Sequence, residues 1–214
     1  LDGPGAVPAG TLAIDGWQEL VAGFVMWAGP MPARVIARAG HADLPDLVRF
    51  CHRLEMPTTV RTGPAGLTEA RATELLDRGM ATCELVIHGL DAEAEAAARA
   101  LVGARHVRAG QLSVRLHLVG MADPSPELVA RARALGVDAT VRSAPWLGPD
   151  GAPGQRRQGG HCPVAQRRVI VNPDGSIGSC PFKAGTARAF PPDLVAHREA
   201  IRRCDRACAH PETV

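Results

Sequence analysis

Hydrophobic and polar residues follow two different periods along the first two thirds of the chain. Segments whose apolar residues recur every three or four positions predict helices, and short apolar runs rich in β-branched residues predict strands. Helices are expected at residues 15–27, 43–54, 68–78, 91–102 and 126–135, and strands at residues 34–38, 58–62, 83–87, 112–119 and 137–141. Strands that alternate with helices in this way predict an α/β fold with a parallel sheet, arranged as an open sheet or as a partial (β/α) barrel.

The pattern changes after this region. Residues 148–160 are rich in proline and glycine and predict a linker. Beyond it, apolar segments at 167–171 and 176–180 flank the turn sequence Asn172-Pro173-Asp174-Gly175, which predicts a β-hairpin, and residues 193–203 predict a helix. The expected organisation is a partial barrel, a linker and a small cysteine-rich hairpin and helix module, at residues 1–147, 148–160 and 161–214.

Composition narrows the functions that the chain can have. Aromatic residues make up 3% of the 214 residues, so few rings can stack on bases, and a nucleic-acid partner is not expected. No apolar run approaches the roughly 18 residues that cross a bilayer, and residues 1–10 show no signal peptide, so we expect a cytoplasmic protein without a membrane partner. The net charge of +2 is uneven, because residues 151–214 carry ten basic and five acidic residues. This basic excess is either a solvated face or compensation for a buried anionic centre.

The six cysteines fall into two groups. Cys51 and Cys83 lie in apolar segments and are expected to be buried core thiols. The other four are in the last 53 residues: Cys162, Cys180, Cys204 and Cys208. A reducing compartment favours metal binding over disulfides for such a set. Four thiolates are sufficient for one tetrahedral zinc site or one [4Fe–4S] cluster.

The spacing of these four cysteines favours iron–sulfur over zinc. Structural zinc is commonly held by two short Cys-x2–4-Cys pairs, whereas Cys162 and Cys180 are separated by 17 residues that include the predicted hairpin. Each of the two is followed by proline, as is common beside iron–sulfur clusters. Zinc, or no metal at all, remains an alternative at this point. Two neighbouring histidines are either substitute ligands or ordinary surface residues: His161 and His210.

The cysteine spacing resembles a known motif. Cys162, Gly175 and Cys180, separated by 12 and four residues, resemble the opening motif of SPASM and twitch domains, which are auxiliary-cluster extensions of radical S-adenosylmethionine (SAM) enzymes. Cys204-x3-Cys208 is similar to the end of the family's second cysteine group, whose first two cysteines are absent here. The resemblance therefore implies one auxiliary [4Fe–4S] cluster, with these four cysteines as its ligands.

The N-terminal region resembles the family's partial barrel, with its SAM-binding motifs replaced. The family's Gly-Gly-Glu-Pro segment, which binds the methionyl amine of SAM, corresponds to Ala-Gly-His-Ala at 39–42. Its Thr-Asn-Gly corresponds to Thr-Gly-Pro at 62–64, and its Ser-Ile-Asp-Gly to Val-Ile-His-Gly at 86–89. The Cys-x3-Cys-x2-Cys triad that leaves one iron open for SAM does not occur in the 214 residues. The resemblance thus implies that this chain does not bind SAM.

Polar residues at the predicted strand ends form a second candidate site. They are His41, Thr62, His88 and His117. Ligands of α/β proteins bind at the carboxyl ends of parallel strands, so these residues are candidates for a ligand site, and the alternative is that they are ordinary polar loop residues.

The resemblance implies a radical-SAM-like protein that serves as a cluster-bearing partner in peptide or natural-product modification and is not catalytic alone. Its expected partner is an active radical SAM enzyme or a peptide substrate. Contact is expected at an open sheet edge along strand 34–38 and through the basic segment 151–214. Two alternatives remain: an active radical SAM maturase whose triad lies upstream of Leu1, and a zinc-stabilised binding module.

Overall fold

A computed structural model describes residues 12–87, 89–107, 113–119, 125–137, 142–144, 169–171 and 174–178. The chain divides into two compact units. One contains Leu1–Gly29 together with Gln155–Val214, and the other contains Pro30–Gly154.

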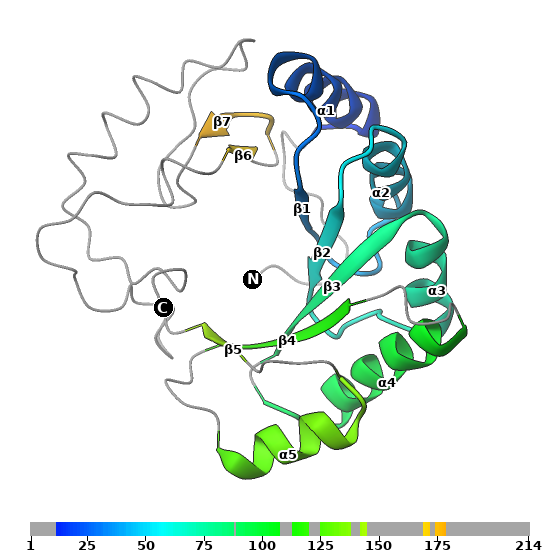
Figure 1. The fold of residues 1–214 in the computed structure, drawn as a ribbon, viewed down its shortest axis with the longest axis vertical. Coiled ribbons are helices and arrows are strands. Elements are labelled where there is room, and N and C mark those ends of the chain that lie inside the picture. Colours follow the sequence, from blue (N-terminus) through cyan, green and yellow to red (C-terminus); the bar gives the residue numbers. More distant parts are fainter. Residues whose placement is uncertain are drawn as a thin grey trace, which may run out of the picture. The chain divides into compact units, whose positions relative to one another are not determined.

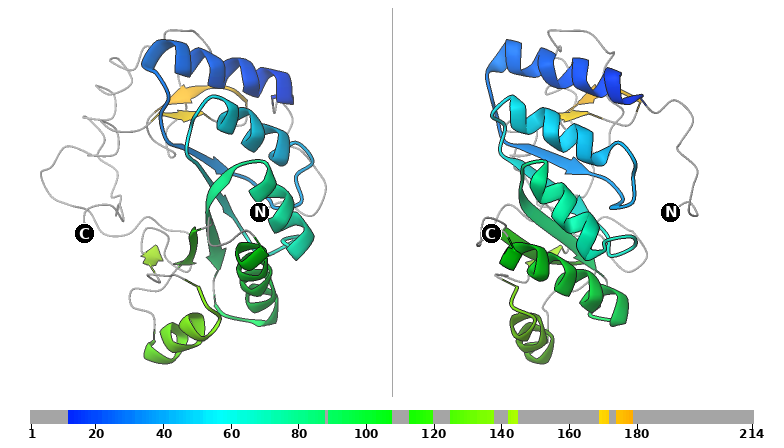
Figure 2. Two further views of the ribbon diagram at one scale, coloured as in Figure 1. Left: turned by 45° about the vertical axis from the view of Figure 1, so that its right-hand side comes forward. Right: turned by 90° about the vertical axis from the view of Figure 1, so that its right-hand side faces the viewer.

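The larger unit is built on a parallel sheet whose strand order follows the chain, β1-β2-β3-β4-β5 (Figure 1). The strands are β1 (Ala33–Ile36), β2 (Thr58–Thr62), β3 (Met80–Ile87), β4 (Ser113–Val119) and β5 (Arg142–Ala144). The helices between them are α2 (Leu44–Arg53), α3 (Glu69–Asp77), α4 (Ala92–Val107) and α5 (Pro126–Ala134). Parallel crossovers are right-handed, so strands that succeed one another in one direction place all of their helices on one face of the sheet. The views in Figures 1 and 2 agree with this arrangement, and the predicted α/β fold with a parallel sheet is confirmed.

Local sequence signals explain where these helices begin and end. Thr68 precedes α3, and its hydroxyl accepts a hydrogen bond from the amide of Arg71 at 3.2 Å, as an N-cap residue does. Asp91 caps α4 in the same way, with Oδ1 2.8 Å from the amide of Ala94. After α3, Gly79 adopts a φ of 101°, a left-handed conformation that glycine reaches without strain.

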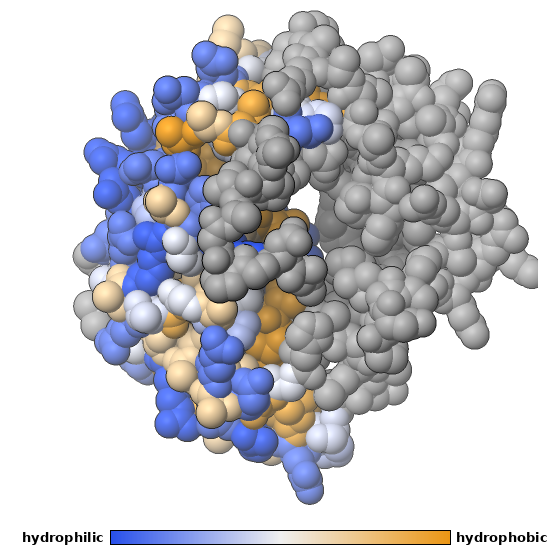
Figure 3. All heavy atoms as spheres, turned by 180° about the vertical axis from the view of Figure 1, so that it is seen from behind, coloured by the Kyte–Doolittle hydropathy of each residue, from blue (hydrophilic) through white to orange (hydrophobic). Residues whose placement is uncertain are grey.

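The hydrophobic core of this unit lies between the sheet and the helices. Its buried members include Val60, Cys83, Leu85 and Val114 from the strands and Val48, Leu75, Ala98 and Leu101 from the helices. Cys51 and Cys83 are 1% and 0% exposed, so the prediction that both are core thiols is confirmed. The surface along the helices is mostly hydrophilic (Figure 3). In the described residues, no helix combines the length and the apolar character needed to cross a membrane.

The fifth described strand lies after the segment in which one was expected. A strand was expected at 137–141, of which the structure describes only Val137, and β5 covers Arg142–Ala144. Val137 directly follows the turn at Gly136 and is 6% exposed in the core cluster, without belonging to a strand. Its hydrophobic character therefore reflects packing of the segment after α5 and not pairing in the sheet.

The smaller unit joins the start of the chain to its C-terminal part. Helix α1 (Ile14–Ala28) contributes Phe24 to a hydrophobic cluster with Ile177, which is fully buried. Ile177 belongs to β7 (Ile177–Gly178), which pairs antiparallel with β6 (Ile170–Val171). The predicted hairpin is confirmed in this shorter form. The expected linker at 148–160 and helix at 193–203 lie outside the described residues, so the predicted domain boundaries stay predictions.

Candidate functional site

Charged side chains lie on the face of the sheet opposite the helices. Side chains alternate between the two faces of a strand, so the neighbours of core residues point away from the helices. Cys83 and Leu85 belong to the core, and Glu84 between them lies on the opposite face. By the same alternation, Arg34 precedes Val35, Arg61 follows Val60, and Arg115 follows Val114. We call Arg34, Arg61, Glu84 and Arg115 the charged face.

The strand register places three of these residues in one row. Arg61 on β2 is the partner of Glu84 on β3, and Glu84 is the partner of Arg115 on β4. Neighbouring strands in a sheet are about 4.8 Å apart, so the three backbones are immediate neighbours. Arg34 on β1 is the partner of Thr59, two residues before Arg61. The charged face therefore spans four adjacent strands.

Glu84 is a buried carboxylate held between two guanidinium groups. It is 2% exposed, its Oε1 accepts a hydrogen bond from Nη2 of Arg34 at 3.1 Å, and its Oε2 accepts one from Nε of Arg61 at 2.8 Å. Burying a carboxylate costs free energy because it loses its hydration, and hydrogen-bonded ion pairs such as these offset that loss. Burial, followed by the charge of Glu84, raises the pKa of the adjacent Cys83 thiol to about 12, so Cys83 is a neutral thiol at any ordinary pH.

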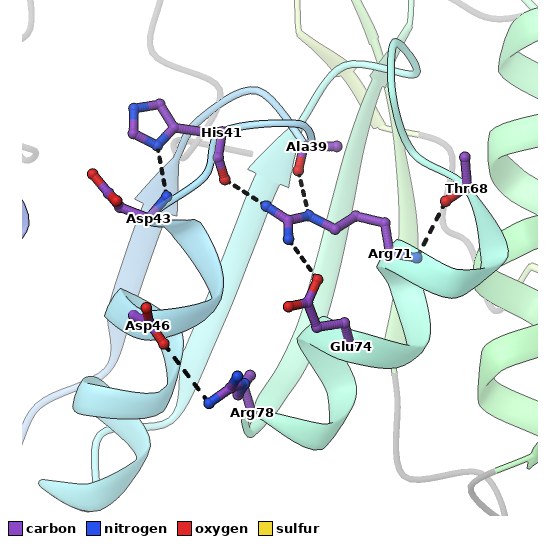
Figure 4. A network of polar contacts seen from close by, with 8 residues as sticks. All are labelled: Ala39, His41, Asp43, Asp46, Thr68, Arg71, Glu74 and Arg78. Atoms are coloured by element: carbon purple, nitrogen blue, oxygen red, sulfur yellow. Dashed lines mark hydrogen bonds and ion pairs between the residues drawn. The ribbon is translucent and has the colours of Figure 1, made fainter.

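The loop after β1 is held by an arginine from α3 (Figure 4). Nε of Arg71 donates to the carbonyl of Ala39 at 2.7 Å, and Nη2 donates to the carbonyl of His41. Nη1 of the same guanidinium forms an ion pair with Glu74 at 2.5 Å. Arg71 therefore fixes two carbonyls of the segment 39–42.

Two of the predicted strand-end residues are next to loops that touch: His41 lies in the loop after β1, and Thr62 is the last residue of β2, directly before the next loop. A Cβ on Gly66, in the loop after β2, would lie 3.4 Å from the amide nitrogen of Gly40, so the two loops are in contact. His41 is exposed, and its Nδ1 accepts from the amide of Asp43 at 3.3 Å. The hydroxyl of Thr62 is engaged as well, because Thr62 is 3% exposed and donates to the carbonyl of Gly63 at 3.3 Å.

The other predicted site residues lie partly or wholly outside the described part of the chain. His117 lies in β4, where it is the register partner of Val86 and Arg142, but the description does not extend to its side chain. His88 and the four predicted metal ligands lie outside the described residues: Cys162, Cys180, Cys204 and Cys208. Within the described ranges, no three histidine, cysteine or carboxylate side chains are grouped as a metal site would require.

The sequence reasoning missed the charged face. The available signal was a charged residue between β-branched or apolar residues of a predicted strand. Examples are Arg61 in Thr58–Thr62 and Glu84 in Met80–Ile87. The pairing of charged residues from different strands could not be predicted from the sequence pattern, because it depends on strand order and register.

Comparison of the sequence with protein-family models and with curated proteins finds no match.

Proposed function

We propose that this chain is a radical-SAM-like protein that does not cleave SAM and carries one auxiliary [4Fe–4S] cluster. It would act as the partner of an active enzyme in the modification of a peptide or natural product. The observation that carries the proposal is that Arg71 donates hydrogen bonds to two carbonyls of the loop at 39–42. A cation at this position is what we expect of a protein that does not bind the ammonium group of SAM there.

The electrostatics of this loop argue against SAM. The segment Ala39-Gly40-His41-Ala42 offers no carboxylate to an ammonium group. Two of its carbonyls already accept hydrogen bonds from Arg71, whose positive charge would repel an ammonium group beside it. Desolvating an ammonium group without an anionic partner is costly. The segment is therefore suited to a structural role.

The sheet topology supports a partial barrel. In a (β/α) barrel, parallel strands succeed one another around the sheet with their helices on the outside, as β1 to β5 do here. In a doubly wound fold the strand order reverses at a switch point, and the five described strands have no such reversal. The charged face would then belong to the interior of the barrel.

The cluster assignment rests on the chemistry of the donor set. Four thiols with the SPASM-like spacing are what one [4Fe–4S] cluster needs, and such a cluster would supply electron transfer. Turn residues of the hairpin between Cys162 and Cys180 are in place: Gly175 has a φ of 80°, and the amide of Ser176 donates to Oδ1 of Asp174 at 2.9 Å. The basic excess of residues 151–214 would offset part of the negative charge of a thiolate-ligated cluster.

A protein partner is the second part of the proposal. Among the described strands β1 lies at the edge of the sheet and pairs only with β2, and Ile36 in β1 is 72% exposed. An edge strand offers unpaired backbone groups to another polypeptide. The partner would be an active radical SAM enzyme or a peptide substrate.

The test is anaerobic reconstitution of the full chain, followed by iron, sulfide and zinc analysis and by SAM calorimetry. We expect about four iron and four sulfide per chain, as one cubane cluster requires, and no SAM binding. A colourless protein that holds only zinc would refute the cluster and favour the zinc-stabilised module. Micromolar SAM binding would refute the non-cleaving assignment and favour an active maturase.

A further inference from the structure

The charged face carries more positive charge than its own carboxylate neutralises. Three guanidinium groups, those of Arg34, Arg61 and Arg115, share the face with one carboxylate, that of Glu84. Arg115 is exposed and makes no hydrogen bond or ion pair with the described part of the chain. The four residues therefore leave an excess of two positive charges on one side of the sheet.

The two arginines that pair with Glu84 also retain unused donors. An arginine has five N–H donors, and in the described part of the chain Arg34 and Arg61 each use one of them, both on Glu84. The Arg61 side chain is only 19% exposed, so water reaches its remaining donors poorly. Partly buried guanidinium groups are most stable when planar oxyanions accept from two of their donors at once.

We propose that the charged face binds an oxyanion, a carboxylate or a phosphate group, of a ligand that lies against the sheet. Arg61 and Arg115 would contact the oxyanion, because they flank Glu84 in one register row. Glu84 is a positioning residue: it holds the Arg34 and Arg61 side chains against the sheet by its two oxygens. This proposal does not depend on the cluster or on the absence of SAM binding.

The same row indicates what lies next to the oxyanion. Ile36 on β1 is the register partner of Arg61 and is 72% exposed. Its neighbour Val35 packs against the core, so Ile36 is on the side of the charged face. The face is thus cationic with an apolar margin at the sheet edge. Acidic side chains flanked by apolar ones, or a phosphate on an apolar body, have the matching chemistry.

Calorimetry on the full chain at low salt tests the proposal. The probes are inorganic phosphate, the peptide acetyl-Leu-Glu-Glu-Leu-amide and its neutral counterpart acetyl-Leu-Gln-Gln-Leu-amide. We expect binding of phosphate, of the acidic peptide, or of both, and no binding of the neutral peptide. Whichever anionic probe binds identifies the source of the oxyanion. Equal binding of the acidic and neutral peptides, or no binding of either anionic probe at millimolar concentration, would overturn the proposal.

Variants localise the binding to this face. Arg115→Gln should weaken binding of the anionic probe about tenfold, as the loss of one charge-assisted contact implies. The matched control is Arg133→Gln, an exposed arginine on α5, which should bind as the wild type does. Because Arg115 is exposed, its replacement leaves the core intact, and circular dichroism verifies the fold. Equal affinity of the Arg115→Gln and Arg133→Gln proteins would refute the assignment of the site.

Discussion

Glu84 and Arg61 are register partners on β3 and β2, and Oε2 of Glu84 lies 2.8 Å from Nε of Arg61. The ion pair is largely shielded from solvent, since the side chain of Glu84 is 2% exposed and that of Arg61 is 19% exposed. In such surroundings the loss of one partner costs far more than at the surface, because the other charge is left without compensation.

Removing Arg61 should therefore destabilise the protein strongly. We expect Arg61→Ala to lower the free energy of unfolding by about 3 kcal/mol, the scale for breaking a buried ion pair. Urea unfolding measures this. The control is Arg99→Ala, whose pair with Glu95 at 3.2 Å involves a largely exposed arginine and should cost about 0.5 kcal/mol or less. Similar losses in the two variants would contradict the buried character of the Glu84 pair.

Gly79 is predicted to be irreplaceable at the end of α3. Its φ is 101°, and a Cβ there would lie 2.3 Å from Cγ of the His52 ring. Gly79→Ala combines left-handed strain, about 1–2 kcal/mol, with this clash. Thermal unfolding should show a large loss for Gly79→Ala and almost none for Gly63→Ala, because Gly63 has no atom within 4 Å of a Cβ.

The contribution of the clash can be separated from that of the backbone. His52→Gly removes every side-chain atom that meets the new methyl group, including Cβ at 2.6 Å, so Gly79→Ala should cost less stability in the His52→Gly background than in the wild type. If Gly79→Ala cost as much stability in the His52→Gly background as in the wild type, the close approach of His52 would not be the cause.

The two buried thiols predict a loss of stability at alkaline pH. Burial raises the pKa of Cys51 to about 11 and that of Cys83 to about 12, from an ordinary value of 9.0. Below pH 9 the thiols are protonated in the folded and unfolded states alike. As the pH rises above 9, the unfolded chain releases these protons first, so stability falls by about 1.4 kcal/mol per pH unit for each thiol, until the pH passes the folded pKa values.

Urea unfolding at pH 8, 9 and 10 measures this slope. The chain has no tyrosine and a single lysine, so the main other groups that titrate in this window are the four remaining cysteines. The Cys51→Ala/Cys83→Ala double variant keeps the other four cysteines and should lose most of the slope relative to the wild type. An unchanged slope in that variant would show that the two thiols are not protonated core residues.

Metal content should separate the two groups of cysteines. Cys51→Ala and Cys83→Ala remove buried thiols, and we expect normal iron content with a loss of about 1–3 kcal/mol in stability. Cys180→Ala should abolish iron binding and the broad visible absorption of the cluster, because a [4Fe–4S] cluster needs its cysteine ligands. Iron loss in the Cys83→Ala protein, or full iron content in the Cys180→Ala protein, would reverse the proposed ligand assignment.

What the sequence predicted correctly depends on short-range physics. The helix expected at 68–78 forms as α3, and local signals bound it: Thr68 caps its start, and Gly79 follows its end in a left-handed conformation. Strand β2 forms at Thr58–Thr62, where it was expected, because its run of β-branched residues is bounded by proline and glycine. The prediction for the fifth strand failed at Val137, where burial after α5 gives the same apolar signal as a strand.

The candidate site required information that no single segment contains. Arg34 and Glu84 are 50 residues apart in the chain, and Arg61 and Glu84 are 23 apart, so only the strand order and register bring them together. The same holds for Phe24 and Ile177, which share a hydrophobic cluster across most of the chain. Such contacts between distant segments are set by topology, which periodicity alone leaves open.

Arg71 and Arg78 provide a matched pair of variants for the loop at 39–42. Both project from the α3 region (Figure 4), but their contacts differ. Arg71 donates to the carbonyls of Ala39 and His41 and is 16% exposed, whereas Arg78, within the described part of the chain, makes only a 3.7 Å ion pair with a largely exposed Asp46. Arg71→Met should therefore release the loop at 39–42, and Arg78→Met should leave it in place.

Hydrogen–deuterium exchange measures this release residue by residue. For Arg71→Met we expect faster exchange of the amides at His41 and Leu44, which bond to carbonyls of the same loop, and a loss of about 1–3 kcal/mol in stability for the unsatisfied buried groups. For Arg78→Met the expected loss is about 0–1 kcal/mol, as for an exposed pair, with unchanged exchange. If both variants exchanged as the wild type does, Arg71 would not be what holds the loop, and the structural argument against SAM binding would lose its main support.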